Sequence, residues 1–130
     1  MDIVIDTSAV IAVVTKEPDR EAILAATRGA ALFSPRSLPW EIGNAFSAMF
    51  KQRRITKEQA LEALALYQRI PLQLVDVSLA QALTLASQQN IYAYDAYMLL
   101  CAQRQHASLL ALDTALLQTA RVIGVPVVEL

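Results

Sequence analysis

Short apolar segments that alternate with longer helix-like ones constrain the fold of this chain most strongly. Ile3–Ile5, Ala31–Phe33, Leu72–Val75, Leu109–Leu112 and Val127–Glu129 are all short and mostly apolar. Strands of a parallel sheet that is covered on both faces have this composition, and successive parallel strands need a long connection between them. The pattern therefore predicts an α/β fold with a mainly parallel central sheet of four to five short strands, flanked by about seven helices.

The helix boundaries follow from capping residues and prolines. Thr56 and Gln59 have the spacing of a capping box, Ser78 and Gln81 repeat it, and Pro71 separates the two helices. We expect helices over residues 8–14, 18–29, 37–53, 56–69, 78–89 and 93–105, and a last helix that ends near residue 122.

Length and composition predict one domain, residues 1–130. The chain has no internal repeat and no Gly/Ser-rich linker, and 55% of it is apolar. We expect a single core and, from the apolar excess, a buried subunit interface. No apolar segment approaches the roughly 18 to 20 residues that span a membrane. The first residues show no secretory signal and Cys101 is the only cysteine, which predicts a cytoplasmic protein with a buried thiol.

Five acidic residues stand in strongly apolar surroundings. They are Asp6, Glu41, Asp76, Asp95 and Asp113. An ionised carboxylate that is buried without a partner costs several kcal/mol, so each of them requires a helix cap, a cationic partner or a metal ion. The net charge of the chain is −1, and it is net positive once the four carboxylates other than Asp76 are set aside. The overall charge is therefore neutral evidence on a nucleic-acid partner.

Four of these carboxylates are predicted to converge. Asp6 and Asp113 each follow a strand, and in a parallel sheet both fall at the carboxyl edge, where such folds bind ligands. Glu41 and Asp95 lie in the first turns of two long helices, where negative charge is favoured. Oxygen ligands without His or Cys suit Mg²⁺ or Mn²⁺, as one ion or two, and such ions support hydrolysis of a phosphodiester.

The same residues also have structural interpretations, which spacing alone leaves open. Asp6 and Asp113 are suitable N-caps, and Glu41 has Arg36 as a nearby cation. Asp76 stands two residues before the cap Ser78, and we assign it a turn role.

Four motifs occur in order along the chain: Ile3-Val4-Ile5-Asp6-Thr7-Ser8-Ala9, Pro39-Trp40-Glu41-Ile42-Gly43-Asn44-Ala45, Tyr94-Asp95-Ala96 and Leu110-Ala111-Leu112-Asp113. In these motifs the chain resembles the PIN-domain family, particularly the VapC-like toxins of bacterial toxin–antitoxin pairs, over nearly its whole length. The fourth motif departs from the family pattern. Ala111 stands where many relatives have a hydroxyl residue, and Thr114-Ala115 where basic residues often follow.

The resemblance implies a PIN-type endoribonuclease that cleaves structured RNA by metal-activated water. Asp6, Glu41 and Asp95 would hold Mg²⁺ or Mn²⁺, with Asp113 acting directly or through water. Three residues would support these ligands: Thr7, Ser8 and Asn44. A small antitoxin protein and a homodimer are the implied partners. The alternative is a catalytically silent PIN-fold binding module or orphan paralogue, which the altered fourth motif favours.

One basic concentration spans the end of one predicted helix and the start of the next: Lys51, Arg53, Arg54 and Lys57. It is either a solvated helix end or an edge that contacts RNA phosphates. The helix that follows is apolar around most of its circumference, which predicts a homodimer interface. Other phosphoryl-transfer classes are disfavoured, because Asp6 lacks the Asp-x-Asp pattern of phosphatases and the three glycines form no phosphate loop.

Overall fold

Four of the short apolar segments form one parallel sheet in the computed structural model, which describes residues 1–130. The strands are β1 (Asp2–Ile5), β2 (Ala31–Pro35), β3 (Leu72–Val75) and β4 (Ser108–Leu110), in the order β3-β2-β1-β4. All three neighbouring pairs are parallel. The predicted α/β fold with a parallel sheet is confirmed.

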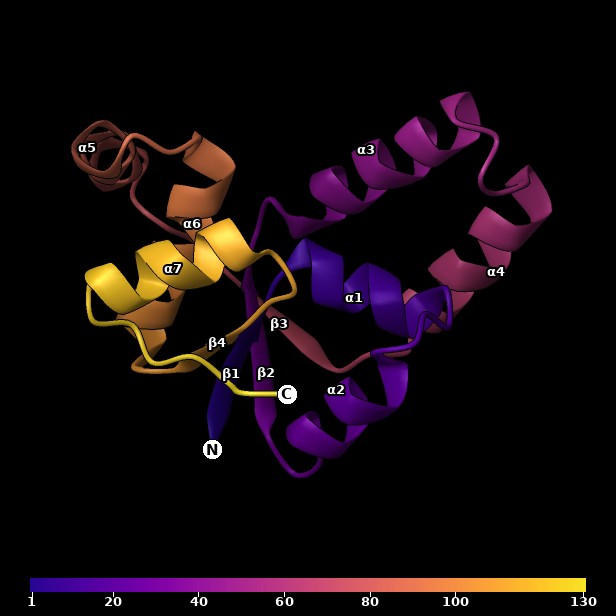
Figure 1. The fold of residues 1–130 in the computed structure, drawn as a ribbon, viewed down its shortest axis with the longest axis horizontal. Helices are drawn as coiled ribbons and strands as arrows, with labels where there is room; N and C mark the ends of the chain where they lie inside the picture. Colours follow the sequence, from indigo (N-terminus) through magenta and orange to yellow (C-terminus); the bar gives the residue numbers. More distant parts are fainter.

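Seven helices surround this sheet (Figure 1). They are α1 (Thr7–Val14), α2 (Arg20–Thr27), α3 (Leu38–Lys51), α4 (Lys57–Tyr67), α5 (Leu79–Gln89), α6 (Ala93–Gln105) and α7 (Thr114–Val122). Helix α6 packs against β1, β2 and β4, while α1 packs against α2, α3 and α4. The central strand β1 is buried from Ile3 to Ile5, and Ile3 and Val4 have no exposed surface. No helix combines the length and the hydropathy that crossing a bilayer requires.

The carboxyl ends of β1 and β4 lie at the first turns of α1 and α7. Ile5 pairs with Leu110, and the backbone N–H of Asp6 donates to the Leu110 carbonyl at 3.1 Å. Figure 1 shows the first turns of α1, α3 and α7 gathered beyond this end of the sheet. The fold therefore brings together residues that are about 100 positions apart in the chain.

The helix ends largely follow the predicted signals. Thr56 and Gln59 form both hydrogen bonds of a capping box, and the Ser78 hydroxyl accepts the Gln81 N–H at 3.2 Å. Helix α6 closes at His106, which adopts a left-handed conformation with φ of 50°.

Two predicted strand boundaries were wrong. Strand β4 ends at Leu110, two residues early, because the N–H of Leu112 turns to the Ser8 hydroxyl at 3.1 Å. The segment Val127–Glu129 forms a single bridge between Val127 and Leu109 and no full strand. Its neighbour Pro126 has no N–H to continue a ladder, so the chain end contributes only a short extension to the sheet.

Candidate metal centre

Asp6 is the most buried of the four predicted site carboxylates, with 6% of its surface exposed. It caps α1, since its Oδ1 accepts the Ala9 N–H at 3.0 Å. The Ser8 hydroxyl donates to its carboxylate oxygens, at 2.8 and 2.9 Å. Burial, and after it the charges of Asp113 and Glu41, raise the pKa of Asp6 to about 6, although both hydrogen bonds lower it. The N-cap interpretation is correct, but the cap does not neutralise the charge.

Glu41 lies in the first turn of α3 and is held by two hydroxyl groups. Thr7 donates to its Oε1 at 3.2 Å and Ser37 to its Oε2 at 2.9 Å. Burial raises the pKa of Glu41, the two hydroxyl groups lower it, and the charge of Asp95 raises it. Both oxygens are thus oriented by neutral donors, and no Lys or Arg pairs with them.

Asp95 and Asp113 complete the group from α6 and α7. Burial, and then the charge of Asp113, raise the pKa of Asp95. Asp113 is exposed and caps α7, accepting the N–H groups of Ala115 and Leu116 at 2.9 and 3.2 Å through one oxygen, Oδ1. Its Oδ2 has no hydrogen bond to the protein and is available to a ligand.

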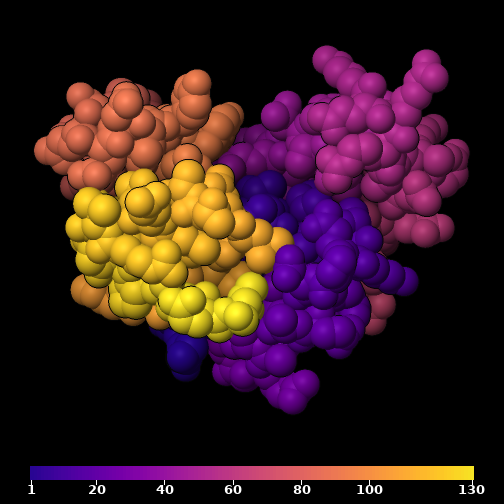
Figure 2. Space-filling model, viewed as in Figure 1, coloured from indigo at the N-terminus to yellow at the C-terminus, as the bar shows by residue number.

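The four carboxylates line a single cavity of about 520 Å³. Their charges act on one another: Asp113 and Glu41 on Asp6, Asp95 on Glu41, and Asp113 on Asp95. None of the three ion pairs in the protein includes any of them. In Figure 2 a furrow runs between the α5–α7 side of the molecule and the α1–α4 side, and the cavity is built from residues of both sides.

The donor set of this cavity fits a hard divalent cation. It offers carboxylate and hydroxyl oxygens and no His or Cys, which is the chemistry that Mg²⁺ and Mn²⁺ prefer. No three acidic, His or Cys side chains lie close enough to hold one ion between them as they stand. The carboxylates therefore face a common space, but their oxygens lie farther apart than the ligands of one bound ion would.

Comparison with known proteins identifies the family. The model of the PIN domain matches residues 3–122. The chain belongs to the PIN-domain family. PIN domains are generally nucleases and typically use divalent metal ions. None of the curated proteins matches the sequence.

Two solved structures share the PIN fold with this chain. One is PAE2754 from Pyrobaculum aerophilum, with a TM-score of 0.72 and 19% identity over 92% of this chain and 79% of that one. The other is VapBC2 from Rickettsia felis bound to a DNA fragment from their promoter, with a TM-score of 0.68 and 16% identity over 98% of each chain. At these identities the likeness establishes the fold.

Two residues of this PIN site were missed by sequence reasoning. Ser37 stands four positions before Glu41, a spacing that places their side chains together on a helix, and it could have been found from this signal. Glu17 also lines the cavity. It follows Lys16, whose left-handed φ of 58° turns the chain after α1, and the sequence around it gives no sign of that turn.

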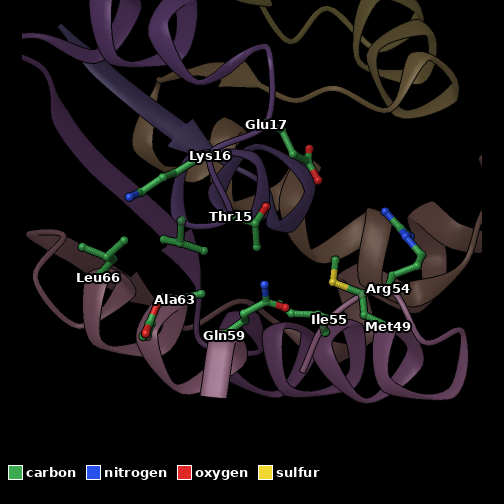
Figure 3. A pocket seen from close by; sticks show the side chains of 11 residues that line it. Thr15, Lys16, Glu17, Met49, Arg54, Ile55, Gln59, Ala63 and Leu66 are labelled. Atoms are coloured by element: carbon green, nitrogen blue, oxygen red, sulfur yellow. The ribbon is translucent and has the colours of Figure 1, made fainter. Parts of the chain in front are cut away.

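The predicted basic residues lie where α3 passes into α4, and only one of them lines the carboxylate cavity. Lys51, Arg53 and Lys57 are exposed, whereas Arg54 lines this cavity and also a neighbouring one of about 390 Å³. Figure 3 shows the neighbouring cavity, where Arg54, Met49 and Glu17 are labelled. These three residues also line the carboxylate cavity.

Three other predicted residues have the following positions. Asn44 is exposed and makes no side-chain hydrogen bond to Glu41, whose oxygens are occupied by Thr7 and Ser37. Arg36 pairs with Asp76 at 2.6 Å instead of Glu41, so Asp76 is an ion-pair partner beyond its expected turn role. Cys101 is buried, as predicted, and burial raises the pKa of its thiol to about 12.

Proposed function

We propose that this PIN domain is a metal-dependent endoribonuclease of the VapC-like toxin type that cleaves structured RNA. One observation carries the proposal: four carboxylates line one cavity, raise one another's pKa values, and have no cationic side chain paired with them. A protein does not keep such an arrangement for stability, because like charges at a buried site oppose folding.

Asp6, Glu41 and Asp95 would hold Mg²⁺ or Mn²⁺, with Asp113 acting directly or through water. When bound, the ion or ion pair activates water and stabilises the oxygens of the phosphodiester that is cut. Ser8 positions Asp6, and Thr7 positions Glu41. Asp6, with a pKa of about 6, releases its proton when it takes up a cation, so metal affinity falls below that pH.

Thermal unfolding against Mn²⁺ concentration tests the metal site without knowledge of the RNA. A ligand that binds only the native state at 100 times its Kd adds about 2.7 kcal/mol, which is on the order of 10 °C in Tm for a domain of this size. We expect this rise for the wild-type protein and its loss in Asp6→Asn. Asp19→Asn is the matched control, because Asp19 is exposed and caps no N–H group with its side chain.

If millimolar Mn²⁺ left the Tm of the wild-type protein unchanged, this result would contradict the proposed metal centre. The four carboxylates would then be caps and hydrogen-bonded groups only. The catalytically silent binding module would become the better account of the altered fourth motif.

The basic residues between α3 and α4 are proposed to contact RNA phosphates. Reversing the charge of Arg53 and Arg54 together (R53E/R54E) should weaken RNA binding. The slope of log K against log salt concentration should become shallower by about 1 to 2, since each phosphate contact contributes about 0.7 to this slope for a single strand. Fluorescence anisotropy at several salt concentrations measures both. R28E/R69E changes the net charge equally at two other exposed arginines, and an equal effect there would assign the loss to overall charge.

Three further properties accompany this proposal. The likeness to VapBC2 supports a small antitoxin protein as a partner. A homodimer stays a prediction, for which Leu61 on α4 offers an apolar side chain that is 55% exposed. A cytoplasmic location is proposed, since the proposed RNA substrate takes part in translation, and no membrane association is proposed.

A further inference from the structure

A second cleft opens on the other side of the first turn of α3. It has a volume of about 320 Å³, and its walls include Ser37, Trp40, Leu79 and Tyr97. The indole of Trp40 is 75% exposed and Leu79 59%. Tyr97 packs against Tyr94 on the same helix, α6, edge to face and with the ring centroids 5.7 Å apart. The cleft therefore presents a broad aromatic surface to solvent.

This cleft adjoins the carboxylate cavity through one helical turn. Ser37 lines the cleft, and its hydroxyl donates to Glu41 Oε2 at 2.9 Å. Trp40 and Glu41 are consecutive residues, about 100° apart around α3, so one faces the cleft while the other faces the cavity. A molecule held at Glu41 thus has the indole ring within its immediate surroundings.

We propose that this cleft binds an unpaired base of the RNA, stacked on Trp40, next to the phosphate that is positioned at the carboxylates. The inference rests on the proposed function and names the part of the substrate that the site recognises. Aromatic side chains bind unpaired bases through their π faces, whereas bases inside a duplex are already stacked on one another. The substrate is accordingly cut at a loop, bulge or end of a structured RNA.

The charges at the rim of the cleft are complementary to such a strand. Arg36, 62% exposed, lines the cleft and pairs with Asp76 at 2.6 Å. Arg104 donates to the Asp76 carbonyl at 3.0 Å. Arg36 is paired with the Asp76 carboxylate, whereas Arg104 is bound only to the Asp76 backbone and has no carboxylate partner. Its positive charge near the rim suits the phosphates that flank a stacked base.

Trp40 is the only tryptophan in the chain, so its fluorescence reports the cleft directly. The experiment mixes the Asp6→Asn protein, which is expected not to cut, with a dye-labelled 12-nucleotide RNA that lacks self-pairing, in Mg²⁺. Anisotropy of the dye measures binding while the indole emission is followed in the same sample. The expected result is quenching of Trp40 on binding of the single strand, and none with the fully paired duplex.

Substitution of Trp40 separates stacking from other contacts. Trp40→Ala should weaken single-strand binding about 5- to 100-fold, in line with one base–aromatic stack, and Trp40→Phe should retain most of it. Val122→Ala removes a side chain of similar exposure (71%) on α7 and should have no effect. Because Trp40 is so exposed, its replacement leaves the core unchanged.

Three outcomes would overturn the inference. Binding without quenching would place the RNA elsewhere, and full single-strand affinity in Trp40→Ala would remove the role of the cleft. A change from dimer to monomer mass in Trp40→Ala would show that a second copy covers the cleft. The proposed function is judged independently by the Mn²⁺ shift in Tm, in which Trp40 takes no part, so failure of one is distinguishable from failure of the other.

Discussion

Asp6→Asn is expected to abolish RNA cleavage while the protein stays folded. Asparagine is as good an N-cap as aspartate, so the Ala9 N–H keeps an acceptor and α1 keeps its first turn. The negative charge at the most buried position of the cavity is lost. We expect cleavage to fall by more than about 100-fold, the upper end for a residue that only supports a metal ligand. Single-turnover cleavage of a structured RNA measures this loss.

The Ser8→Ala variant provides the graded comparison. The Ser8 hydroxyl orients Asp6 and accepts the Leu112 N–H, but it is not itself a proposed ligand. Its removal should cost about 10- to 100-fold, less than the loss of Asp6. Full activity in Asp6→Asn would refute the assignment of Asp6, and a larger loss in Ser8→Ala than in Asp6→Asn would reverse the proposed roles.

The metal-free protein is expected to become less stable as the pH rises from about 4 to about 7. Asp6 has a pKa of about 6 in the folded protein, against 3.8 for an unperturbed aspartate. Within this interval the folded state holds a proton that the unfolded state has released, so the free energy of unfolding falls as the pH rises. The difference between the two pKa values corresponds to roughly 3 kcal/mol. The raised pKa values of Glu41 and Asp95 act in the same direction.

Urea unfolding in EDTA across this interval measures the effect. Asp6→Asn should remove most of the pH dependence of the free energy of unfolding, and this variant should be more stable than the wild type near pH 7.5. Asp19→Asn should keep the wild-type profile. A free energy of unfolding that stays constant or rises through the interval would mean that the carboxylates do not oppose folding, and would remove the electrostatic basis of the proposed site.

The position of the site was predictable where local chemistry alone decides it. An Asp after a buried strand in an α/β chain must lie at the carboxyl edge of the sheet, and this placed Asp6 and Asp113 correctly. Glu41 and Asp95 were predictable because an acidic residue in an otherwise apolar first turn requires a hydrogen-bonding partner, a cation or a metal ion. The parallel sheet followed in the same way from apolar segments that are too short for helices.

Features that depend on tertiary structure were not predictable. Arg36 was one possible cationic partner for Glu41, yet Asp76, 40 positions away, pairs with it across neighbouring strands β2 and β3. Asn44 was placed beside Glu41 from helical spacing alone, but hydroxyl groups of Thr7 and Ser37 reached the carboxylate instead. Asp76 and Thr7 are distant partners that displaced local ones, and no pattern within a single segment reports such competition. Ser37, four positions before Glu41, is the exception, because its helical spacing could have indicated it.

The hydrogen bond between Ser8 and Leu112 joins two points that are 104 residues apart, and this has a consequence for the timing of synthesis. Asp6 and Glu41 leave the ribosome early, but Asp95, β4 and Asp113 are synthesised later. The pairing of β1 with β4 is required to bring the two halves of the cavity together. A nascent chain therefore has no assembled cavity until β4 has left the ribosome.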